Sequence, residues 1–422
     1  MDDGHLEQVY RAEAPRITAA LAARTGDVGL AADAVQDAFV EALEHWPAGG
    51  VPANPGGWLA TTARRKAIDR LRRDRVGQQK LALLAAAGTA GQAGDGPGTR
   101  ADQADDELLG MIFACCHPAL PRESQIALTL RAVCGLTTAE IAAAFLVGEA
   151  AMTQRLLRAR RALGSTGKHG AGKHGAGRDG GHADLRVPDP DQLADRLAEV
   201  LAVVYLVFNE GYLASAGRQP ARRDLAAQAV SLTRLLHRLM PREPEVLGLL
   251  ALLLLHESRA ATRFDGWGRL VRLADQDRAR WNRDLIAEAT GLLDRALALR
   301  DPGPYQVQAA IAALHAEAPD YTRTDWGQIR LLYDRLQALT PSPVVLLNRA
   351  VATRYVVGPE AALAEITPLA AELDSYRLYH ALRAGLLAGL GRDDEARAAS
   401  ERALALAGNP AERELLARRL SF

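Results

Sequence analysis

The stretch LTTAEIAAAFLVGEAAMTQRLLRARRAL, residues 136–163, has the spacing of two short helices. Glu140 follows Thr137 by three residues, which is the pattern of a capping box at the start of a helix that runs to about Phe145. A turn containing Gly148 comes next, and a second, longer helix is expected over Glu149–Leu163. A short helix, a tight turn with glycine and a longer helix form the helix-turn-helix layout, which suits the major groove of DNA.

The two halves of the second helix carry different kinds of polar residue. Its first half, EAAMTQ, is small and polar, whereas Arg155, Arg158, Arg160 and Arg161 follow in its second half. Small residues can approach base edges, and arginines mostly hold phosphates. The same layout also occurs in proteins that bind no DNA, so this segment alone favours DNA binding without requiring it.

A basic helix is expected upstream, over WLATTARRKAIDRLRRDR at 58–75. Its apolar side is modest and rich in alanine, which argues against membrane insertion. Its charges could hold DNA phosphates. Trp58, at the start of this helix, could stack on an exposed base or anchor the core. The seven basic residues are Arg64, Arg65, Lys66, Arg70, Arg72, Arg73 and Arg75.

An acidic stripe is expected on the preceding helix, about Leu30 to His45. The polar residues opposite its Ala/Val/Phe face are Asp33, Gln36, Asp37 and Glu41. Such a stripe is either a solvated face or a docking surface. A loop rich in proline and glycine, 47–57, is expected between this helix and the basic one.

Two glycine-rich segments divide the chain, GTAGQAGDGPGTR at 88–100 and GSTGKHGAGKHGAGRDGG at 164–181. Neither can bury enough apolar area to fold, so both are interpreted as linkers. Apolar residues recur at three- and four-residue spacing elsewhere, and Asn-Gly hairpin signals are absent, so the predicted fold class is all-α. The predicted organisation is a first domain at 1–87, a linker at 88–105, a second domain at 106–163, a linker at 164–185 and a third domain at 186–422.

The third domain contains an internal repeat. Ala350 and Ala362 are 12 residues apart, as are Ala384 and Ala396, and the two pairs are offset by 34 residues. Small residues at this spacing are typical of paired helices in tetratricopeptide repeats, and a third unit is expected near Trp281–Leu299. The concave face of such an array either binds a peptide or protein or packs on the first two domains.

Composition excludes several classes of protein. The 51 basic and 51 acidic residues balance, and three cysteines are too few for a disulfide framework, which fits the cytoplasm. The most apolar stretch, Val246–His256, is too short to span a membrane. Neither Cys115-Cys116-His117 nor His256-Glu257 has metal-ligand spacing, and no nucleotide loop or catalytic triad is present. We therefore expect no cofactor, no metal and no enzyme activity, and buried thiols at the paired cysteines.

A dense group of charges precedes Trp281, comprising Asp275, Asp277, Arg278 and Arg280. A buried ion-pair network that joins helices is the expectation for this group.

Several of these motifs together resemble extracytoplasmic-function (ECF) sigma factors. DAVQDAF at 33–39, PGGWL at 55–59 and RRKAIDRLRR at 64–73 are similar to region 2 of that family, and RLLRAR at 155–160 is similar to the end of region 4. Their order and separation also fit.

The resemblance implies a role for each motif. Core RNA polymerase, through its β′ clamp helices and β flap, and promoter DNA would be the partners. The implied polymerase-binding residues are Asp33, Gln36, Asp37 and Glu41. The implied contacts to the −10 element are Asn54, Trp58, Arg64, Arg65, Lys66, Arg70, Arg72 and Arg73. The implied contacts to the −35 element are Ala151, Thr153, Gln154, Arg155, Arg158, Arg160 and Arg161.

The remainder of the chain resembles a subgroup with a C-terminal tetratricopeptide-like extension, the ECF42-type factors. The stretches that carry this are YLVFNEGY at 205–212, LLLLHES at 252–258 and TPSPVVLLNRAV at 340–351. The resemblance implies that the extension regulates or supports activity, through contact with the sigma domains or with a protein partner. Two alternatives stay open: a helix-turn-helix regulator with a repeat-type sensor domain, and a repeat scaffold whose DNA binding is incidental.

Overall fold

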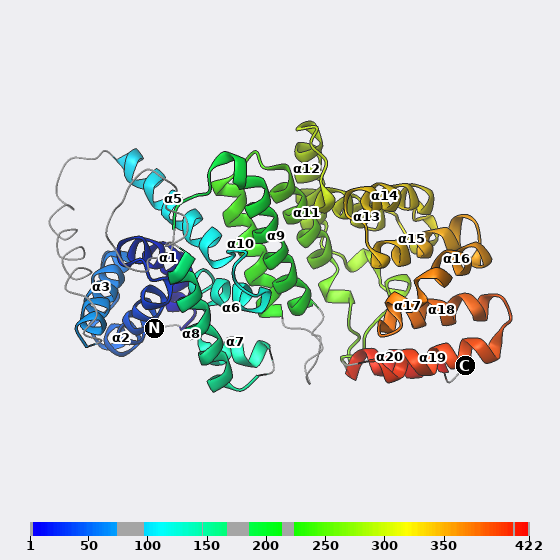
Figure 1. Cartoon of the computed structure of the whole chain (residues 1–422), viewed down its shortest axis with the longest axis horizontal. Coiled ribbons are helices and arrows are strands. Elements are labelled where there is room, and N and C mark those ends of the chain that lie inside the picture. Colours follow the sequence, from blue (N-terminus) through cyan, green and yellow to red (C-terminus); the bar gives the residue numbers. More distant parts are fainter. Residues whose placement is uncertain are drawn as a thin grey trace. The chain divides into compact units, whose positions relative to one another are not determined.

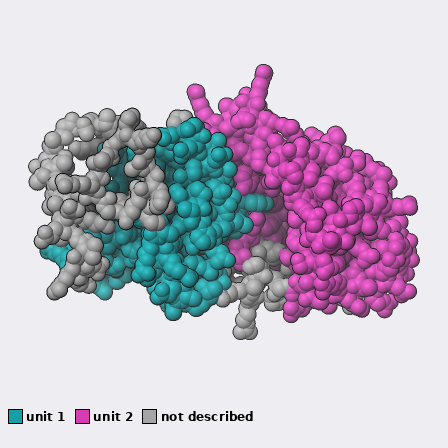
Figure 2. Space-filling view, viewed as in Figure 1, with its two compact units in different colours: residues 1–207 teal, residues 208–422 magenta. Residues whose placement is uncertain are grey.

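A computed structural model describes residues 3–73, 97–145, 147–166, 185–212, 223–407 and 410–420. The chain forms two compact units, Met1–Val207 and Phe208–Phe422 (Figures 1 and 2). In the described residues the regular elements are helices, and extended pairing is limited to one isolated bridge between Phe264 and Leu270. The predicted all-α class is therefore confirmed.

Unit 1 begins with three helices that pack on one another, α1 (Asp3–Thr25), α2 (Val28–Gly49) and α3 (Pro55–Arg73). The start of α2 is fixed by Asp27, whose carboxylate accepts a hydrogen bond from the Leu30 amide at 3.0 Å. The face that α2 buries is mostly alanine, so its neighbours approach closely. These buried residues are Ala31, Ala34, Val35, Ala38 and Ala42.

The connection between α2 and α3 is shorter than the sequence suggested. α2 continues to Gly49 and α3 already starts at Pro55, so the loop spans 50–54 rather than 47–57. Proline suits the first turn of a helix because it has no amide hydrogen to leave unpaired. The Asn54 side chain then accepts a hydrogen bond from the Gly57 amide at 2.9 Å.

The second part of unit 1 contains α5 (Pro97–Cys115), α6 (Arg122–Ala132), α7 (Thr138–Ala144) and α8 (Glu149–Thr166). The predicted capping box is confirmed: Thr137 Oγ1 accepts from the Glu140 amide at 3.1 Å, and Glu140 Oε2 accepts from the Thr137 amide at 2.7 Å. α7 and α8 thus form the expected helix-turn-helix. The face that α8 buries consists of Met152, Leu156, Ala159 and Leu163.

The helix α9 (Pro190–Tyr212) spans the boundary between the units, which falls after Val207. The part of α9 up to Val207 belongs to unit 1, where Arg196 donates to the Phe113 carbonyl at 2.7 Å. Arg122 pairs with Glu199 at 2.7 Å. The unit boundary therefore lies inside a helix, whereas the sequence suggested a third domain from 186.

Unit 2 is a succession of helices, most of which pack on the next one along the chain (Figure 1). They are α10 (Arg223–Leu239), α11 (Pro244–Ser258), α12 (Arg283–Ala298), α13 (Pro304–Glu317), α14 (Trp326–Leu339), α15 (Pro343–Val356), α16 (Pro359–Ile366), α17 (Ala370–Leu373), α18 (Arg377–Gly389), α19 (Asp393–Ala405) and α20 (Pro410–Leu420). Short 3-10 turns lie between some of them: η2 (Ala260–Thr262), η3 (Leu273–Asp275), η4 (Arg278–Arg280), η5 (Tyr321–Arg323) and η6 (Thr367–Leu369).

The helix pairs α15/α16 and α18/α19 start at residues 34 apart, the offset seen in the sequence. All four alanines that define the offset are buried, namely Ala350, Ala362, Ala384 and Ala396. The first pair closes a core that also contains Leu347, Ile366 and Leu386.

Three expectations about single segments can be compared with the structure. Nearly all of α11 is buried, and no helix in the described part of the chain is long and apolar enough to cross a membrane. Cys115 and Cys116 are buried, as expected, and burial raises the pKa of the Cys116 thiol to about 11. The expected buried ion-pair network is wrong. Arg278 is buried, but it donates to the carbonyl oxygens of His315 and Ala318, at 2.5 and 2.8 Å.

Candidate nucleic-acid interface

The exposed face of α8 carries most of the residues predicted to contact duplex DNA. Those whose side chains are exposed are Ala151, Thr153, Gln154, Arg158 and Arg161. Arg155 is only partly exposed and pairs with Glu123 at 3.0 Å. Arg160 points to another part of unit 1. The exposed stripe therefore presents two arginines beside small and polar residues, which fits phosphate contacts with sparse base contacts.

The basic residues of α3 lie partly against the acidic stripe of α2. Lys66 pairs with Glu41 at 2.6 Å, and Arg65 also pairs with Glu41. Arg70 pairs with Asp37 at 2.7 Å and with Asp33 at 3.1 Å. The predicted polymerase-binding and −10-binding surfaces therefore neutralise each other in this structure.

The other predicted −10 residues differ in exposure. Arg72 is exposed and Arg64 is half-buried, whereas the side chain of Arg73 lies outside the described part of the chain. Trp58 is half-buried, and its ring meets the buried Trp46 edge-on, with centroids 5.4 Å apart. This contact gives Trp58 a packing role at the start of α3.

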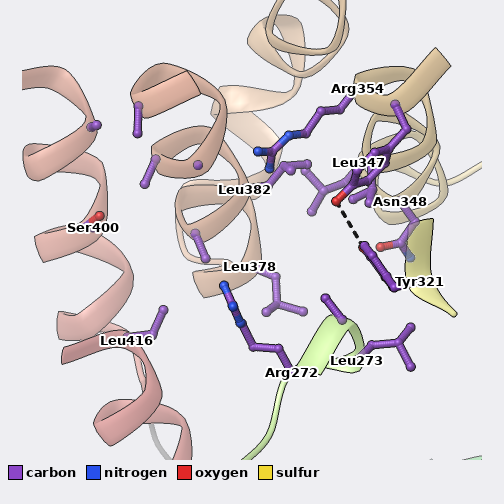
Figure 3. A pocket seen from close by; sticks show the side chains of 18 of the residues that line it. Arg272, Leu273, Tyr321, Leu347, Asn348, Arg354, Leu378, Leu382, Ser400 and Leu416 are labelled. Atoms are coloured by element: carbon purple, nitrogen blue, oxygen red, sulfur yellow. Dashed lines mark hydrogen bonds between the residues drawn. The ribbon is translucent and has the colours of Figure 1, made fainter. Parts of the chain in front are cut away.

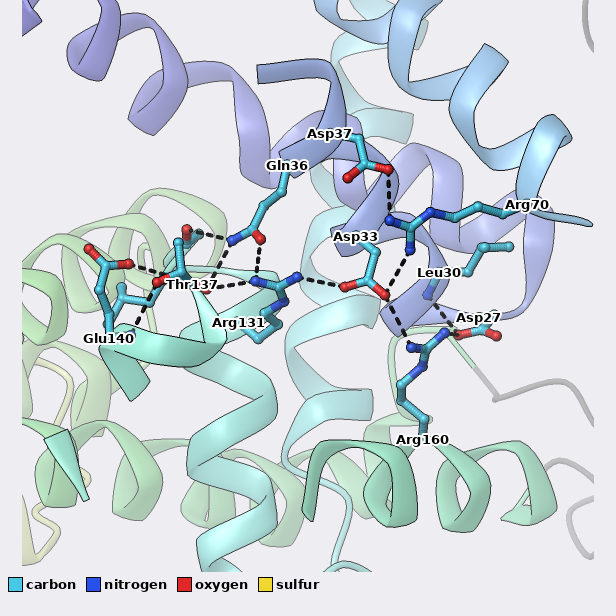
Figure 4. Close-up of polar contacts among 12 residues, drawn as sticks. Asp27, Leu30, Asp33, Gln36, Asp37, Arg70, Arg131, Thr137, Glu140 and Arg160 are labelled. Atoms are coloured by element: carbon cyan, nitrogen blue, oxygen red, sulfur yellow. Dashed lines mark hydrogen bonds and ion pairs between the residues drawn. The ribbon is translucent and has the colours of Figure 1, made fainter. Parts of the chain in front are cut away.

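Asp33 lies at the centre of an arginine cluster drawn from three helices (Figure 4). Besides Arg70 of α3, it accepts from Arg131 of α6 at 2.6 Å and from Arg160 of α8 at 3.3 Å. The side chains of Asp33 and Arg131 are 24% and 12% exposed, so these charges are largely shielded from water. Removing one member would leave a partly desolvated charge behind, which is costly.

Gln36 is held by the same part of α6 and the turn that follows it. Its amide nitrogen donates to the carbonyl oxygens of Leu136 and Gly135, at 3.1 and 3.3 Å, and its amide oxygen accepts from Arg131. The hydrogen bonds of the Gln36 side chain thus reach α6 and the segment that leads into the helix-turn-helix (Figure 4).

The remaining acidic residues of the stripe are held by α3. The Lys66 hydrogen bond, reinforced by Arg65, lowers the pKa of Glu41 below its usual value, so this carboxylate is ionised at neutral pH. All four predicted polymerase-binding residues are therefore engaged within unit 1, two of them by the helix-turn-helix part.

Arg160 reaches Asp33 by passing over Gly29 at the start of α2. A β-carbon on Gly29 would lie 1.9 Å from Arg160 Nε, so only glycine leaves room for this side chain. Arg160 also contacts Asp27 at 3.4 Å. An arginine predicted to hold −35 phosphates is instead directed at the first helices of the unit.

Two features of the site were not predicted from the sequence. Arg131 had no recognisable signal, because its partners lie 95 and 98 residues away along the chain. Val40 and Leu43 are apolar and yet 53% and 44% exposed on α2. Their position next to the acidic stripe was visible in the helical periodicity.

Comparison with known families gives three matches along the chain. Residues 9–76 match sigma-70 region 2, residues 110–163 match sigma-70 region 4, and residues 196–297 match a family of unknown function, DUF6596. The chain is also 45% identical to an uncharacterised protein of Rhizobium meliloti over 97% of its own length and 94% of the relative's. No solved structure matches.

The chain belongs to the same family as that protein and carries sigma-70 regions 2 and 4 followed by a DUF6596 extension. Region 2 corresponds to α1–α3, and region 4 extends from α5 to α8. These two domains support a sigma-factor role in promoter recognition and transcription initiation, so this is a DNA-binding protein. The DUF6596 match starts at residue 196, within the part of α9 that belongs to unit 1.

Proposed function

We propose that this protein is an alternative sigma factor of the ECF42 type, which binds core RNA polymerase through α2 and recognises the −10 and −35 promoter elements through α3 and α8. We assign it to the cytoplasm and to no enzymatic reaction. The observation that carries the proposal is that both sigma regions stand in one chain with a helix-turn-helix whose outer face is exposed.

The proposed polymerase contact is wider than the acidic stripe alone. Asp33, Gln36, Asp37 and Glu41 would supply the polar part. The exposed Val40 and Leu43 supply an apolar part, since large exposed apolar side chains on a helix commonly mark a partner surface. The β′ clamp helices are the proposed occupant of this surface, and the β flap is proposed to contact region 4.

On this proposal, region 4 must separate from α2 before unit 1 can bind a promoter. The same Asp33 and Gln36 that would contact polymerase hold Arg131, and Arg160 is turned toward α2. Polymerase therefore competes with region 4 for α2. Opening would also return Arg160 to the DNA side of α8.

The extension is proposed to regulate or support this activity through a tetratricopeptide-like array of helices. The support is the 34-residue offset between two successive helix pairs with buried alanines at equivalent positions. Such arrays present surfaces to protein partners.

The test is run-off transcription with purified core polymerase on promoter fragments from the source genome. The full-length protein should yield a promoter-dependent transcript. Replacing Arg64, Arg65 and Lys66 together by alanine should abolish open-complex formation while polymerase binding persists.

A different outcome would favour a helix-turn-helix regulator. If the protein alone footprints a duplex operator and no fragment supports a transcript, the sigma-factor proposal fails. Loss of polymerase binding in the triple-alanine variant would overturn the assignment of α3 to the −10 element.

A further inference from the structure

Unit 2 contains a groove with a volume of about 860 Å³ between its last helices (Figure 3). Its walls come from η3, η5, α15, α18, α19 and α20. The guanidinium groups of Arg272 and Arg354 point into this space from two sides. Nothing in the proposed promoter-binding machinery uses this groove.

The groove follows the helical repeat. On α15 the lining residues include Leu347, Asn348, Val351 and Arg354, and on α18 they include Ala381, Leu382, Gly385 and Ala388. Each residue of the second set lies 34 positions after its counterpart in the first. Equivalent faces of α15 and α18, the first helices of two successive pairs, therefore line the same groove. A surface that repeats along an axis suits an extended chain better than a compact ligand.

Small side chains keep the floor of the groove low. At Gly385 an added β-carbon would lie 3.6 Å from Arg354 Nη1, an ordinary van der Waals contact, so the guanidinium lies close to α18. The other small lining residues are Ala274, Ala381, Ala384, Ala388, Ala396 and Ser400. The small lining side chains leave the middle of the groove open for an extended chain.

The charge of the groove is positive. Arg272, Arg354 and Arg397 line it, against Asp393 as its acidic lining residue. Arg272 is already bound by Asp275, at 2.5 and 2.9 Å. Arg354 and Arg397 form no ion pair with any carboxylate among the described residues. Two guanidinium groups are therefore available to an anionic group in the groove.

Apolar side chains lie beside these cations. Leu378 and Tyr355 are 44% and 45% exposed at the groove. Tyr355 is held in place by stacking on Trp326, with ring centroids 4.2 Å apart, and by a 3.2 Å hydrogen bond between its hydroxyl and that of Tyr321. A rigid aromatic wall next to an exposed leucine can cover an aliphatic side chain at low entropic cost.

We propose that this groove binds an extended acidic segment of a partner protein. Arg354 and Arg397 bind its carboxylates, and Leu378 and Tyr355 cover an aliphatic side chain next to them. The proposal does not depend on the sigma-factor function, because it concerns peptide binding alone.

The experiment uses the full-length protein as bait for a displayed library of short random peptides. The recovered peptides are synthesised with a fluorescent label, and binding is measured by polarisation. We expect them to be rich in aspartate and glutamate, with an aliphatic residue at a constant distance from a carboxylate. Arg397→Glu and Arg354→Glu should each weaken binding about tenfold or more. Because the Arg397 side chain is exposed, we expect its replacement to leave the fold intact, and a thermal unfolding curve checks this.

The matched control is Arg335→Glu, which reverses an exposed arginine on α14 outside the groove and should leave affinity unchanged. Four results overturn the proposal: no peptide is retained, the recovered peptides lack carboxylates, acidic peptides bind Arg397→Glu as well as the native protein, or Arg335→Glu weakens binding equally. Binding of a labelled single-stranded oligonucleotide that is lost in Arg397→Glu, with no peptide binding, would identify a nucleic-acid groove instead.

Discussion

His315 in unit 2 is a buried histidine that is kept neutral by its surroundings. Burial, together with the positive charges of Arg259 and Arg278, lowers its pKa to about 4. Its ring lies edge-on to Trp326, with centroids 5.2 Å apart, and Nδ1 has no hydrogen-bond partner among the described residues. The folded state therefore cannot take up a proton that the unfolded chain binds readily near pH 6.5.

This difference in proton binding predicts acid sensitivity. The unfolded state gains a proton as pH falls below about 6.5 and the folded state does not, so stability should fall by up to about 1.4 kcal/mol per pH unit for this group, down to its folded pKa. His315→Phe keeps an aromatic ring against Trp326 and removes the titration. We expect a smaller loss of unfolding free energy between pH 7 and pH 5 in the variant, measured by urea denaturation. Equal losses in both proteins would contradict the assignment.

Single residues also mark the limit of what the sequence can predict. Asp33, Gln36, Asp37 and Glu41 could be placed on one helical face from periodicity alone. Their partner Arg131 could not, because the contact depends on how α6 packs against α2. Arg278 is similar: four charges in a row suggested ion pairs, but the burial of that side chain against two carbonyl oxygens is set by tertiary packing.

At the scale of elements, α7 depends on its capping box. Thr137→Ala and Glu140→Ala should each destabilise this part of the protein by about 1 kcal/mol, because each removes the partner of an otherwise unpaired helix-end group. The double variant should lose less unfolding free energy than the two single variants together, since the two hydrogen bonds depend on each other. Thr138→Ala is the control, as its hydroxyl takes no part in the cap. Urea unfolding of the native protein and the four variants measures the effects, and strict additivity would count against a reciprocal cap.

The contact between α2 and α6 yields a prediction about polymerase affinity. Arg131→Met keeps the length of the side chain and removes its bonds to Asp33 and Gln36. On the proposed function, closing of unit 1 competes with polymerase, so the variant should bind core polymerase about tenfold more tightly. Binding is measured by titrating labelled protein with core enzyme.

Arg16→Met is the matched control for that experiment, since Arg16 forms an exposed ion pair with Asp105, at 3.0 Å, that involves no proposed polymerase contact. It should leave affinity unchanged. Unchanged or weaker binding by a folded Arg131→Met variant would show that the contact does not compete. Absence of binding by the native protein would instead count against the sigma-factor proposal.

Element boundaries were predictable where a local signal fixes them. The capping box indicated the start of α7, and apolar residues at three- and four-residue spacing indicated α2 and α8. The predicted loop, 47–57, is longer than the observed one, 50–54, because the prediction placed both Pro47 and Pro55 in the loop. Proline can occupy a helix's first turn, and only the packing of the two helices decides which positions are helical.

At the scale of the whole molecule, α9 begins in unit 1 although it follows the glycine-rich segment. Arg196 and Glu199 tie it to α5 and α6. Cleavage by a sequence-specific protease at a site introduced between Thr166 and Leu185 should therefore leave the two pieces together on a sizing column. Separate elution of the pieces would disprove this.

The matched variant carries Arg196→Met and Glu199→Ala, which remove both polar ties. It should release the pieces more readily after cleavage, because the polar contacts of these two side chains with α5 and α6 are lost. The same variant left uncut should elute as the native protein does.

The pairing of α3 with α2 has a consequence for the salt dependence of promoter binding. Arg65, Lys66 and Arg70 already have carboxylates as internal counterions, so DNA that approaches the free protein displaces Glu41, Asp37 and Asp33 rather than salt. The logarithm of the DNA affinity should then fall less steeply with the logarithm of the salt concentration than the number of basic residues suggests. If polymerase takes over the acidic stripe, the three cations become free and the slope steepens. Polymerase and DNA would then each strengthen the binding of the other by the same factor, a thermodynamic linkage built into two neighbouring helices.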